Sequence, residues 1–132
     1  MNKDKFNILV TEDEAITAED IRASLKLIGY NNVDVSLTDT QAINLTQQKK
    51  YDLILMDVKL NGSRYNGIEL SKIINNDIPI IYCTAHSDSE TLYEILHSPH
   101  LSYILKPFEV KKIKDIIDAI FIKKTKGERL WT

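Results

Sequence analysis

The stretch LILMDVKLNG, residues 53–62, places an acidic side chain at the end of an apolar run. The residues from Leu53 to Met56 have the length and apolar character expected of a β-strand. Asp57 closes the run, and the chain then continues with lysine, asparagine and glycine, which are typical of a loop. A carboxylate at the end of so apolar a strand indicates either a charged partner or a chemical function.

Four further apolar runs of strand length occur along the chain, with segments of helical spacing between them. The runs cover residues 6–10, 33–37, 78–83 and 103–105. Apolar residues recur at helical spacing at Ala18, Ile21, Leu25 and Ile28, before Gly29, and at Ile113, Ile116, Ile117 and Ile120. We expect the other helices within residues 40–50, 67–75 and 88–97. Strand and helix therefore alternate five times, which predicts an α/β fold with a parallel sheet covered on both faces.

The composition is that of a single globular domain. The 132 residues are 43% hydrophobic and 27% charged, with four glycines and three prolines, which argues against a disordered or fibrous chain. We expect one folded domain over residues 1–124 and a short C-terminal tail over residues 125–132.

Charge, cysteine content and hydropathy limit the partners and the compartment. The net charge of -2 gives no general attraction to nucleic acid or to a membrane surface, although lysines gather near the C-terminus. The single cysteine, Cys83, excludes an intrachain disulfide, and the sequence has no apolar run long enough to predict a membrane span. We expect a cytoplasmic protein that binds neither nucleic acid nor membrane.

Polar side chains follow four of the predicted strands where ligands of open parallel sheets bind, beyond the carboxyl ends of the strands. They are Glu12 and Asp13, Asp57, Thr84, and Lys106. If the first and third strands are neighbours, the three acids converge, and two carboxylates about 4 Å apart repel by roughly 4 kcal/mol at an effective dielectric near 20. Lys106 supplies one compensating charge. The oxygen-only cluster also predicts a hard divalent cation, and Mg²⁺ fits best.

A simpler interpretation is that these acids are surface residues that cap helices at strand-to-helix turns. We favour that interpretation for Glu14, Asp39 and Asp88. It does not account for the set described above, because five suitable side chains would have to fall by coincidence at equivalent ends of different strands.

Four segments of the sequence resemble the receiver domain of two-component response regulators, in the family's order and spacing. They are LVTEDE (residues 9–14), YDLILMD (51–57), PIIYCTA (79–85) and SYILKPF (102–108). The resemblance covers nearly the whole chain. It implies a flavodoxin-like (βα)5 fold with strand order 2-1-3-4-5.

The resemblance also implies a role for each matched residue. Asp57 would accept a phosphoryl group from a phosphohistidine, and Asp13 and Asp57 would bind Mg²⁺ directly. Glu12 would assist through water, and the backbone carbonyl of Lys59 would complete the protein ligands. The remaining roles are phosphoryl stabilisation by Thr84 and Lys106, a change of rotamer on activation at Tyr103 together with Thr84, and a cis peptide before Pro107.

The segment after Asp57 departs from the family pattern. Receivers commonly have proline four residues after the acceptor and glycine eight after it, whereas Asn61 and Tyr65 stand there in this chain. The loop NGSRYNG, residues 61–67, is therefore about two residues longer. The sequence is most similar to single-domain receivers associated with sensor histidine kinases that carry PAS domains. Lys59 and His86 would flank the site and tune how quickly water reaches the acyl phosphate.

Two other activities are found on related architectures, and the sequence argues against both. An FMN site needs backbone N–H groups of a loop rich in serine, threonine and glycine after the first strand. The run Glu12, Asp13 and Glu14 would instead repel a phosphate. A phosphohydrolase of the haloacid dehalogenase type needs a second acid two residues after the nucleophile, where this chain has Lys59.

The expected partners follow from the resemblance. A sensor histidine kinase or a phosphotransfer protein would supply the phosphoryl group. The face made by the fourth helix, fifth strand and fifth helix, around Leu92, Ile95, Tyr103 and Ile113, would then bind a partner or a second copy to form a homodimer. One alternative stays open: a receiver-fold module that signals by protein contact without phosphorylation.

Overall fold

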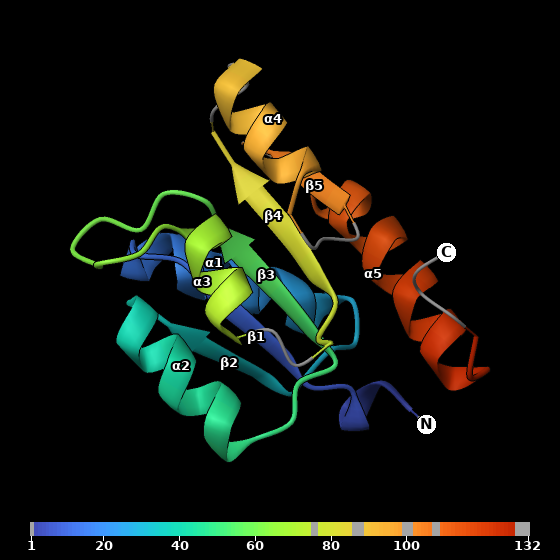
Figure 1. The fold of residues 1–132 in the computed structure, drawn as a ribbon. Coiled ribbons are helices and arrows are strands. Elements are labelled where there is room, and N and C mark those ends of the chain that lie inside the picture. The colour runs from blue at the N-terminus through green and yellow to red at the C-terminus, as the bar shows by residue number, and fades with distance from the viewer. Residues whose placement is uncertain (1, 75–76, 86–88, 99–101, 107–108, 129–132) are drawn as a thin grey trace.

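The computed structural model describes residues 2–74, 77–85, 89–98, 102–106 and 109–128. Within these residues the chain forms one sheet of five parallel strands, in the order β2-β1-β3-β4-β5 (Figure 1). The strands are β1 (Ile8–Thr11), β2 (Val33–Ser36), β3 (Leu53–Asp57), β4 (Ile80–Thr84) and β5 (Ser102–Leu105). The predicted α/β class and strand order are confirmed.

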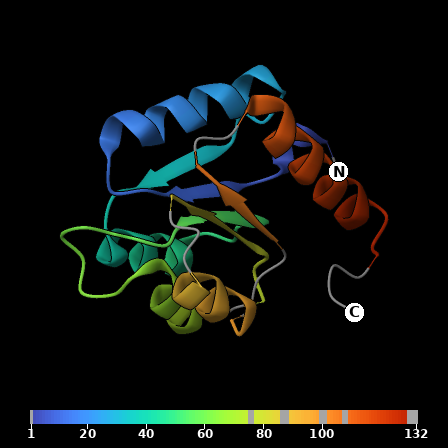
Figure 2. The same cartoon turned by 90° about the horizontal axis from the view of Figure 1, so that it is seen from above.

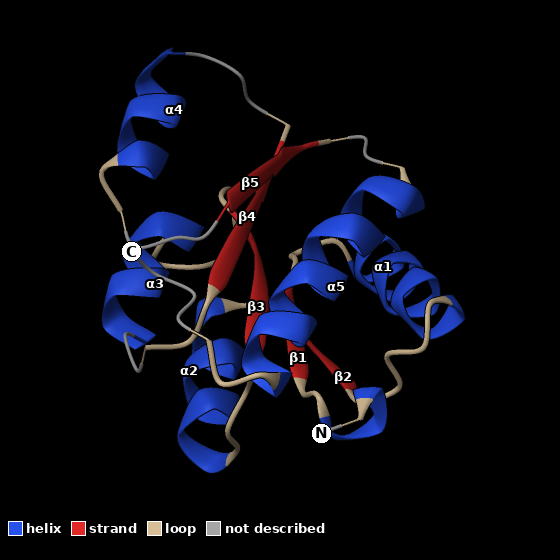
Figure 3. Cartoon of the chain, turned by 90° about the vertical axis from the view of Figure 1, so that its right-hand side faces the viewer, coloured by secondary structure: helices blue, strands red, loops and turns tan. Residues whose placement is uncertain are grey.

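Helices cover both faces of this sheet. They are α1 (Ala15–Leu27), α2 (Asp39–Gln48), α3 (Gly67–Ile74), α4 (Ser89–Leu96) and α5 (Val110–Thr125). Figure 2 shows α1 and α5 on one face and α2, α3 and α4 on the other, and Figure 3 shows the same layers from the side. The structure therefore has three layers, with the sheet in the middle.

Alternation along the strands divides the core into two clusters, one on each face. Ile8 and Val10 of β1 pack toward α1 and α5, whereas Leu9 between them packs on the opposite side. The helices contribute to the cluster on the α1 and α5 side with the residues that the predicted periodicity indicated. The buried residues are Ala18, Ile21 and Leu25 of α1 and Ile113, Ile117 and Ile120 of α5. Gly29 follows α1 with φ +101°, a backbone conformation that glycine adopts without strain.

Several predicted boundaries differ from the structure by one or two residues. The first strand begins at Ile8 because Lys3–Lys5 form a short 3₁₀ helix and Phe6 turns its ring toward Tyr30 and Phe121. The fourth strand begins after Pro79, which has no N–H to donate to a neighbouring strand. At the other end of the chain, α5 extends to Thr125, one residue beyond the predicted domain boundary. No helix in the described part of the chain has the length and apolar character needed to span a membrane.

Candidate functional site

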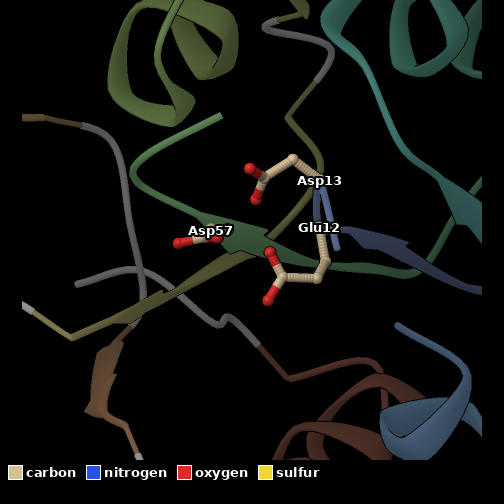
Figure 4. A group of neighbouring side chains, drawn as sticks. All are labelled: Glu12, Asp13 and Asp57. Atoms are coloured by element: carbon tan, nitrogen blue, oxygen red, sulfur yellow. The ribbon is translucent and has the colours of Figure 1, made fainter. Parts of the chain in front are cut away.

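Three carboxylates meet where the two central strands end. Glu12 and Asp13 follow β1 directly, and Asp57 is the last residue of the neighbouring strand β3, which pairs with β1 in parallel register. One oxygen from each side chain lies within 4.8 Å of the others (Figure 4). Glu12 and Asp57 are buried, whereas Asp13 is half-buried. The predicted convergence of the three acids is therefore present in the folded chain.

Lys106 brings a positive charge to this cluster from the end of β5. Its Nζ lies 2.6 Å from Oε1 of Glu12 and 3.2 Å from Oδ2 of Asp57. Its backbone N–H donates to the carbonyl of Thr84 at 2.8 Å, which ties the end of β5 to the end of β4. Burial alone would lower the pKa of the Lys106 ammonium, but Glu12 and Asp57 outweigh it and raise that pKa. Lys106 is therefore a stable cation at neutral pH.

One lysine does not compensate the three acids. Burial, with Asp57 beside it, raises the pKa of the Glu12 carboxyl to about 8 despite the contact with Lys106. The second oxygen of Glu12, Oε2, is buried and has no hydrogen-bond partner within the described residues. An unpartnered carboxylate oxygen beside two other acids fits the all-oxygen coordination that Mg²⁺ prefers. The residues present therefore suit a divalent cation.

The loop that joins β3 to α3 is pressed against Asp57. A Cβ added to Gly67 would lie 2.0 Å from the backbone oxygen of Asp57, which no side chain can tolerate. The Gly67 N–H donates to the carbonyl of Val58 at 2.7 Å, so the first residue of α3 closes back on the end of β3. The loop therefore starts and ends at the acidic cluster.

Two acids outside the loop accept hydrogen bonds from backbone N–H groups in its central part. The N–H of Asn61 donates to Oδ2 of Asp13 at 3.1 Å, and the N–H groups of Arg64 and Tyr65 donate to Oδ2 of Asp39 at 3.0 and 3.1 Å. The interpretation of Asp39 as a surface residue is wrong, since it begins α2 but is only 6% exposed. Sequence reasoning missed this contact because it depends on how the loop folds back.

The structure places the other predicted site residues as follows. Thr84 is buried at the end of β4, and its β5 neighbour in register is Leu105. Lys59 is exposed, and its N–H lies 3.4 Å from Oδ1 of Asp57. Tyr103 lies beside Tyr82 in register and is 36% exposed. His86, Asp88 and Pro107 lie outside the described residues.

The fold and the acidic edge define a receiver-type α/β domain, and sequence comparison gives the family. Residues 8–118 match the family model described as the response regulator receiver domain. The chain therefore belongs to the receiver domains of two-component response regulators. Domains of this family bind Mg²⁺ at an acidic pocket, and Glu12, Asp13 and Asp57 form such a cluster in this chain.

Curated relatives are longer than this chain. It is 34% identical over 115 residues to the transcriptional regulatory protein PdtaR of Mycobacterium tuberculosis, a match that covers 86% of the chain and 54% of the relative. It is 32% identical over 117 residues to the transcriptional regulatory protein ZraR of Klebsiella oxytoca, covering 86% and 26%. The chain thus spans about half of one relative and about a quarter of the other.

Solved structures agree with this fold. The N-terminal domain of a response regulator/sensory box/GGDEF 3-domain protein from Carboxydothermus hydrogenoformans superposes with a TM-score of 0.79 at 26% identity, covering 92% of this chain and 99% of that one. A two-component response regulator from Clostridium difficile gives a TM-score of 0.83 at 24% identity, covering 91% and 98%. The second likeness concerns the fold alone.

Proposed function

We propose that the chain accepts a phosphoryl group on Asp57 from a histidine kinase or a phosphotransfer protein, with Mg²⁺ as cofactor. The observation that carries this proposal is the convergence of Glu12, Asp13 and Asp57 at one edge of the sheet, where Lys106 pairs with Glu12 and Asp57. In the reaction, a bond forms between phosphorus and a carboxylate oxygen of Asp57 as the phosphorus–nitrogen bond of the donor breaks. The electron pair of the broken bond stays on the donor's imidazole.

The chain's own residues would position and neutralise the reacting groups. Asp57 ends a strand that is buried along its whole length, so its carboxylate is held in a fixed direction. The ammonium of Lys106, 3.2 Å from Oδ2 of Asp57, would balance negative charge that develops on the phosphoryl oxygens. Thr84 would donate a hydrogen bond to one of those oxygens.

Four residues would hold Mg²⁺. Asp13 and Asp57 would supply carboxylate oxygens, Lys59 its backbone carbonyl, and Glu12 a contact through water. The bound cation would supply charge neutralisation for transfer between two groups that are both negatively charged. The buried Oε2 of Glu12, which has no hydrogen-bond partner among the residues that the structure describes, supports this assignment.

Phosphorylation would change the surface made by α4, β5 and α5. Apolar side chains are already exposed there, namely Tyr93, Leu96, Tyr103, Leu105 and Val110. Two residues that the sequence placed on this surface, Ile95 and Ile113, are instead 0% and 1% exposed and belong to the core. A turn of the Tyr103 ring toward Thr84 would bury part of this surface and prepare it for a partner or for homodimer formation.

Four finer assignments complete the proposal. Lys59 and His86 would tune the lifetime of the acyl phosphate. Residues 1–124 would form the receiver domain, with residues 125–132 as a tail. The chain would work in the cytoplasm. Its kinase would be of the kind that carries PAS domains, on the strength of the sequence resemblance.

Acetyl phosphate and Mg²⁺ test the central assignment, with intact mass as the readout. We expect the protein to gain one phosphoryl group, and Asp57→Asn to gain none, because the amide keeps the shape but removes the nucleophile. Labelling should also stop in excess chelator. Phosphorylation of Asp57→Asn, or equal labelling with chelator present, would contradict the site. A chain that is never labelled would favour the alternative, a binding module that signals without phosphorylation.

A further inference from the structure

Asp39 contacts the β3–α3 loop through both its backbone and its side chain. Its carboxylate accepts hydrogen bonds from the N–H groups of Arg64 and Tyr65, and its own N–H donates to Oγ of Ser63 at 3.0 Å. The other oxygen, Oδ1, accepts from the N–H of Thr40 at 2.8 Å within the first turn of α2. The first residue of one helix thus binds three consecutive residues of a loop 24 to 26 positions away.

These contacts fix the carboxylate in its ionised form. Burial alone would raise the pKa of Asp39, but the backbone N–H groups of Tyr65, Thr40 and Arg64 and the Ser63 hydroxyl outweigh it, and the pKa is lowered. Hydrogen bonds to a charged acceptor are stronger than those between neutral groups. The loop is therefore held by a charge that is compensated by backbone dipoles.

The contacts of Asp39 with Ser63, Arg64 and Tyr65, which we call the Asp39 tether, are linked to Lys59 by a short series of further contacts. The N–H of Ser63 donates to the carbonyl of Leu60 at 3.2 Å, and the Leu60 side chain is buried in the core on this face of the sheet. On the other side of Lys59, the Val58 N–H donates to the carbonyl of Cys83, and the Val58 carbonyl accepts from Gly67. The peptide that carries the Lys59 carbonyl therefore lies between two anchored residues, and Asp39 secures one of them.

We propose that Asp39 is a positioning residue for the phosphoryl site, which sets the place of the Lys59 carbonyl through the β3–α3 loop. The proposal rests on the proposed function, in which that carbonyl is a Mg²⁺ ligand. Asp39 itself touches neither the cation nor the phosphoryl group. Loss of the Asp39 carboxylate would remove no Mg²⁺ ligand, but it would allow one ligand, the Lys59 carbonyl, to move.

Asp39→Asn tests the proposal, because the amide keeps one acceptor oxygen and the size of the side chain while removing the charge. Two quantities are measured: the Kd for Mg²⁺ by calorimetry, and the hydrogen exchange of the Arg64 and Tyr65 amides without Mg²⁺. We expect the Kd to rise about tenfold, as is typical when a residue that orients a metal ligand is changed. Exchange at both amides should become faster.

Two further variants separate positioning from general stability. Ser63→Ala removes one loop contact of Asp39 and should raise the Kd for Mg²⁺ by a smaller factor, which tests the tether even if Asp39→Asn fails to fold. Asp34→Asn is the matched control, because Asp34 accepts from Tyr51 at 2.7 Å and pairs with Lys49 at 3.0 Å, and none of these residues belongs to the loop. It should lower the melting temperature and leave the Kd unchanged.

The outcomes distinguish this proposal from the proposed function. An unchanged Kd in both Asp39→Asn and Ser63→Ala, beside a wild-type protein that binds Mg²⁺ and accepts phosphate, would overturn the positioning role alone. An equal rise of Kd in Asp34→Asn would also overturn it, since the effect would then reflect stability. A wild-type chain that binds no Mg²⁺ would overturn the proposed function and the positioning role together.

Discussion

Gly67 is the residue on which the packing of the acceptor strand against the next helix depends. Its Cα faces the backbone of Asp57 so closely that a methyl group would meet the Asp57 carbonyl oxygen at 2.0 Å and the Met56 side chain at 2.9 Å. The Asp57 backbone cannot yield, because it belongs to a strand paired on both sides. Any larger residue must therefore push the start of α3 away from the site.

Gly67→Ala should lower the free energy of unfolding by about 2 kcal/mol, as overpacking of a close contact does. It should also slow the phosphorylation of Asp57, because the loop on which Lys59 sits must move. Urea unfolding and the labelling rate with acetyl phosphate measure the two effects.

Gly127→Ala is the control for this prediction, because Gly127 follows α5 and lies outside the β3–α3 loop. Gly127 has φ +70° and nothing within 4 Å of an added Cβ, so alanine should lower the free energy of unfolding by about 1 kcal/mol through backbone strain alone. Its labelling rate should stay at the wild-type value. Similar labelling rates in the two variants would show that the contact at Gly67 does not shape the site.

At the scale of elements, Asp118 joins α5 to the N-terminal turn and to the segment that follows α1. It accepts a hydrogen bond from Tyr30 at 2.6 Å and pairs with Lys114 at 2.6 Å and with Lys3 at 3.4 Å. Burial would raise the pKa of Asp118, but Lys114, Tyr30 and Lys3 outweigh it and lower the pKa. The ionised carboxylate therefore stabilises the fold.

The sign of the pH effect follows from this lowered pKa. The unfolded chain binds the Asp118 proton more readily than the folded chain, so the stabilisation is present above the ordinary pKa near 4 and is lost as the pH falls below it. Asp118→Asn should lower the free energy of unfolding by about 1 kcal/mol at pH 7. Between about pH 5 and pH 3, the free energy of unfolding of this variant should fall less steeply than that of the wild type. Asp115→Asn, at an exposed position on the same helix, should leave the pH profile as it is. Urea unfolding across this pH range measures both, and identical profiles for the two variants would contradict the role of Asp118.

Elements with strong periodicity could be predicted from the sequence, and contacts made by folded loops could not. The apolar runs predicted every strand to within two residues. The signal is clearest for the three central strands, β1, β3 and β4, because a strand buried on both faces needs a nearly unbroken apolar sequence. The acids at strand ends could be placed together because parallel strands end at one edge. The burial of Asp39 could not be foreseen, since it depends on backbone N–H groups of residues 64 and 65 that carry no sequence signal.

At the scale of the whole molecule, the proposed switch links one edge of the sheet to the surface of α4, β5 and α5. Thr84 ends β4, and Tyr103 lies on the neighbouring strand β5. A phosphoryl oxygen that attracts the Thr84 hydroxyl would leave room for the Tyr103 ring. To move such an equilibrium from 1% to 99% active requires about 5.5 kcal/mol of preference for the active form.

Thr84→Ala should accept a phosphoryl group but fail to transmit it. Beryllofluoride, a phosphoryl mimic, should change hydrogen exchange on the α4–β5–α5 surface of the wild-type protein and leave that surface of Thr84→Ala unchanged. Thr46→Ala is the control, because among the described residues the Thr46 hydroxyl bonds to carbonyls of its own helix α2, and it should respond like the wild type. If the wild-type response were confined to the loops around Asp57, the proposed switch would be contradicted, and the chain would act only as a carrier of the phosphoryl group.

Both ends of the described chain lie at the edge of the sheet opposite the acids. The Lys3 ammonium donates to the carbonyl of Ile28, in the segment between α1 and β2. Lys124, near the end of α5, donates to Asp52, the residue before β3. Fluorophores or surface anchors introduced at these two positions would therefore lie at the end of the sheet away from Asp57. A pair of labels there would report whether the two ends of the domain are folded against the sheet.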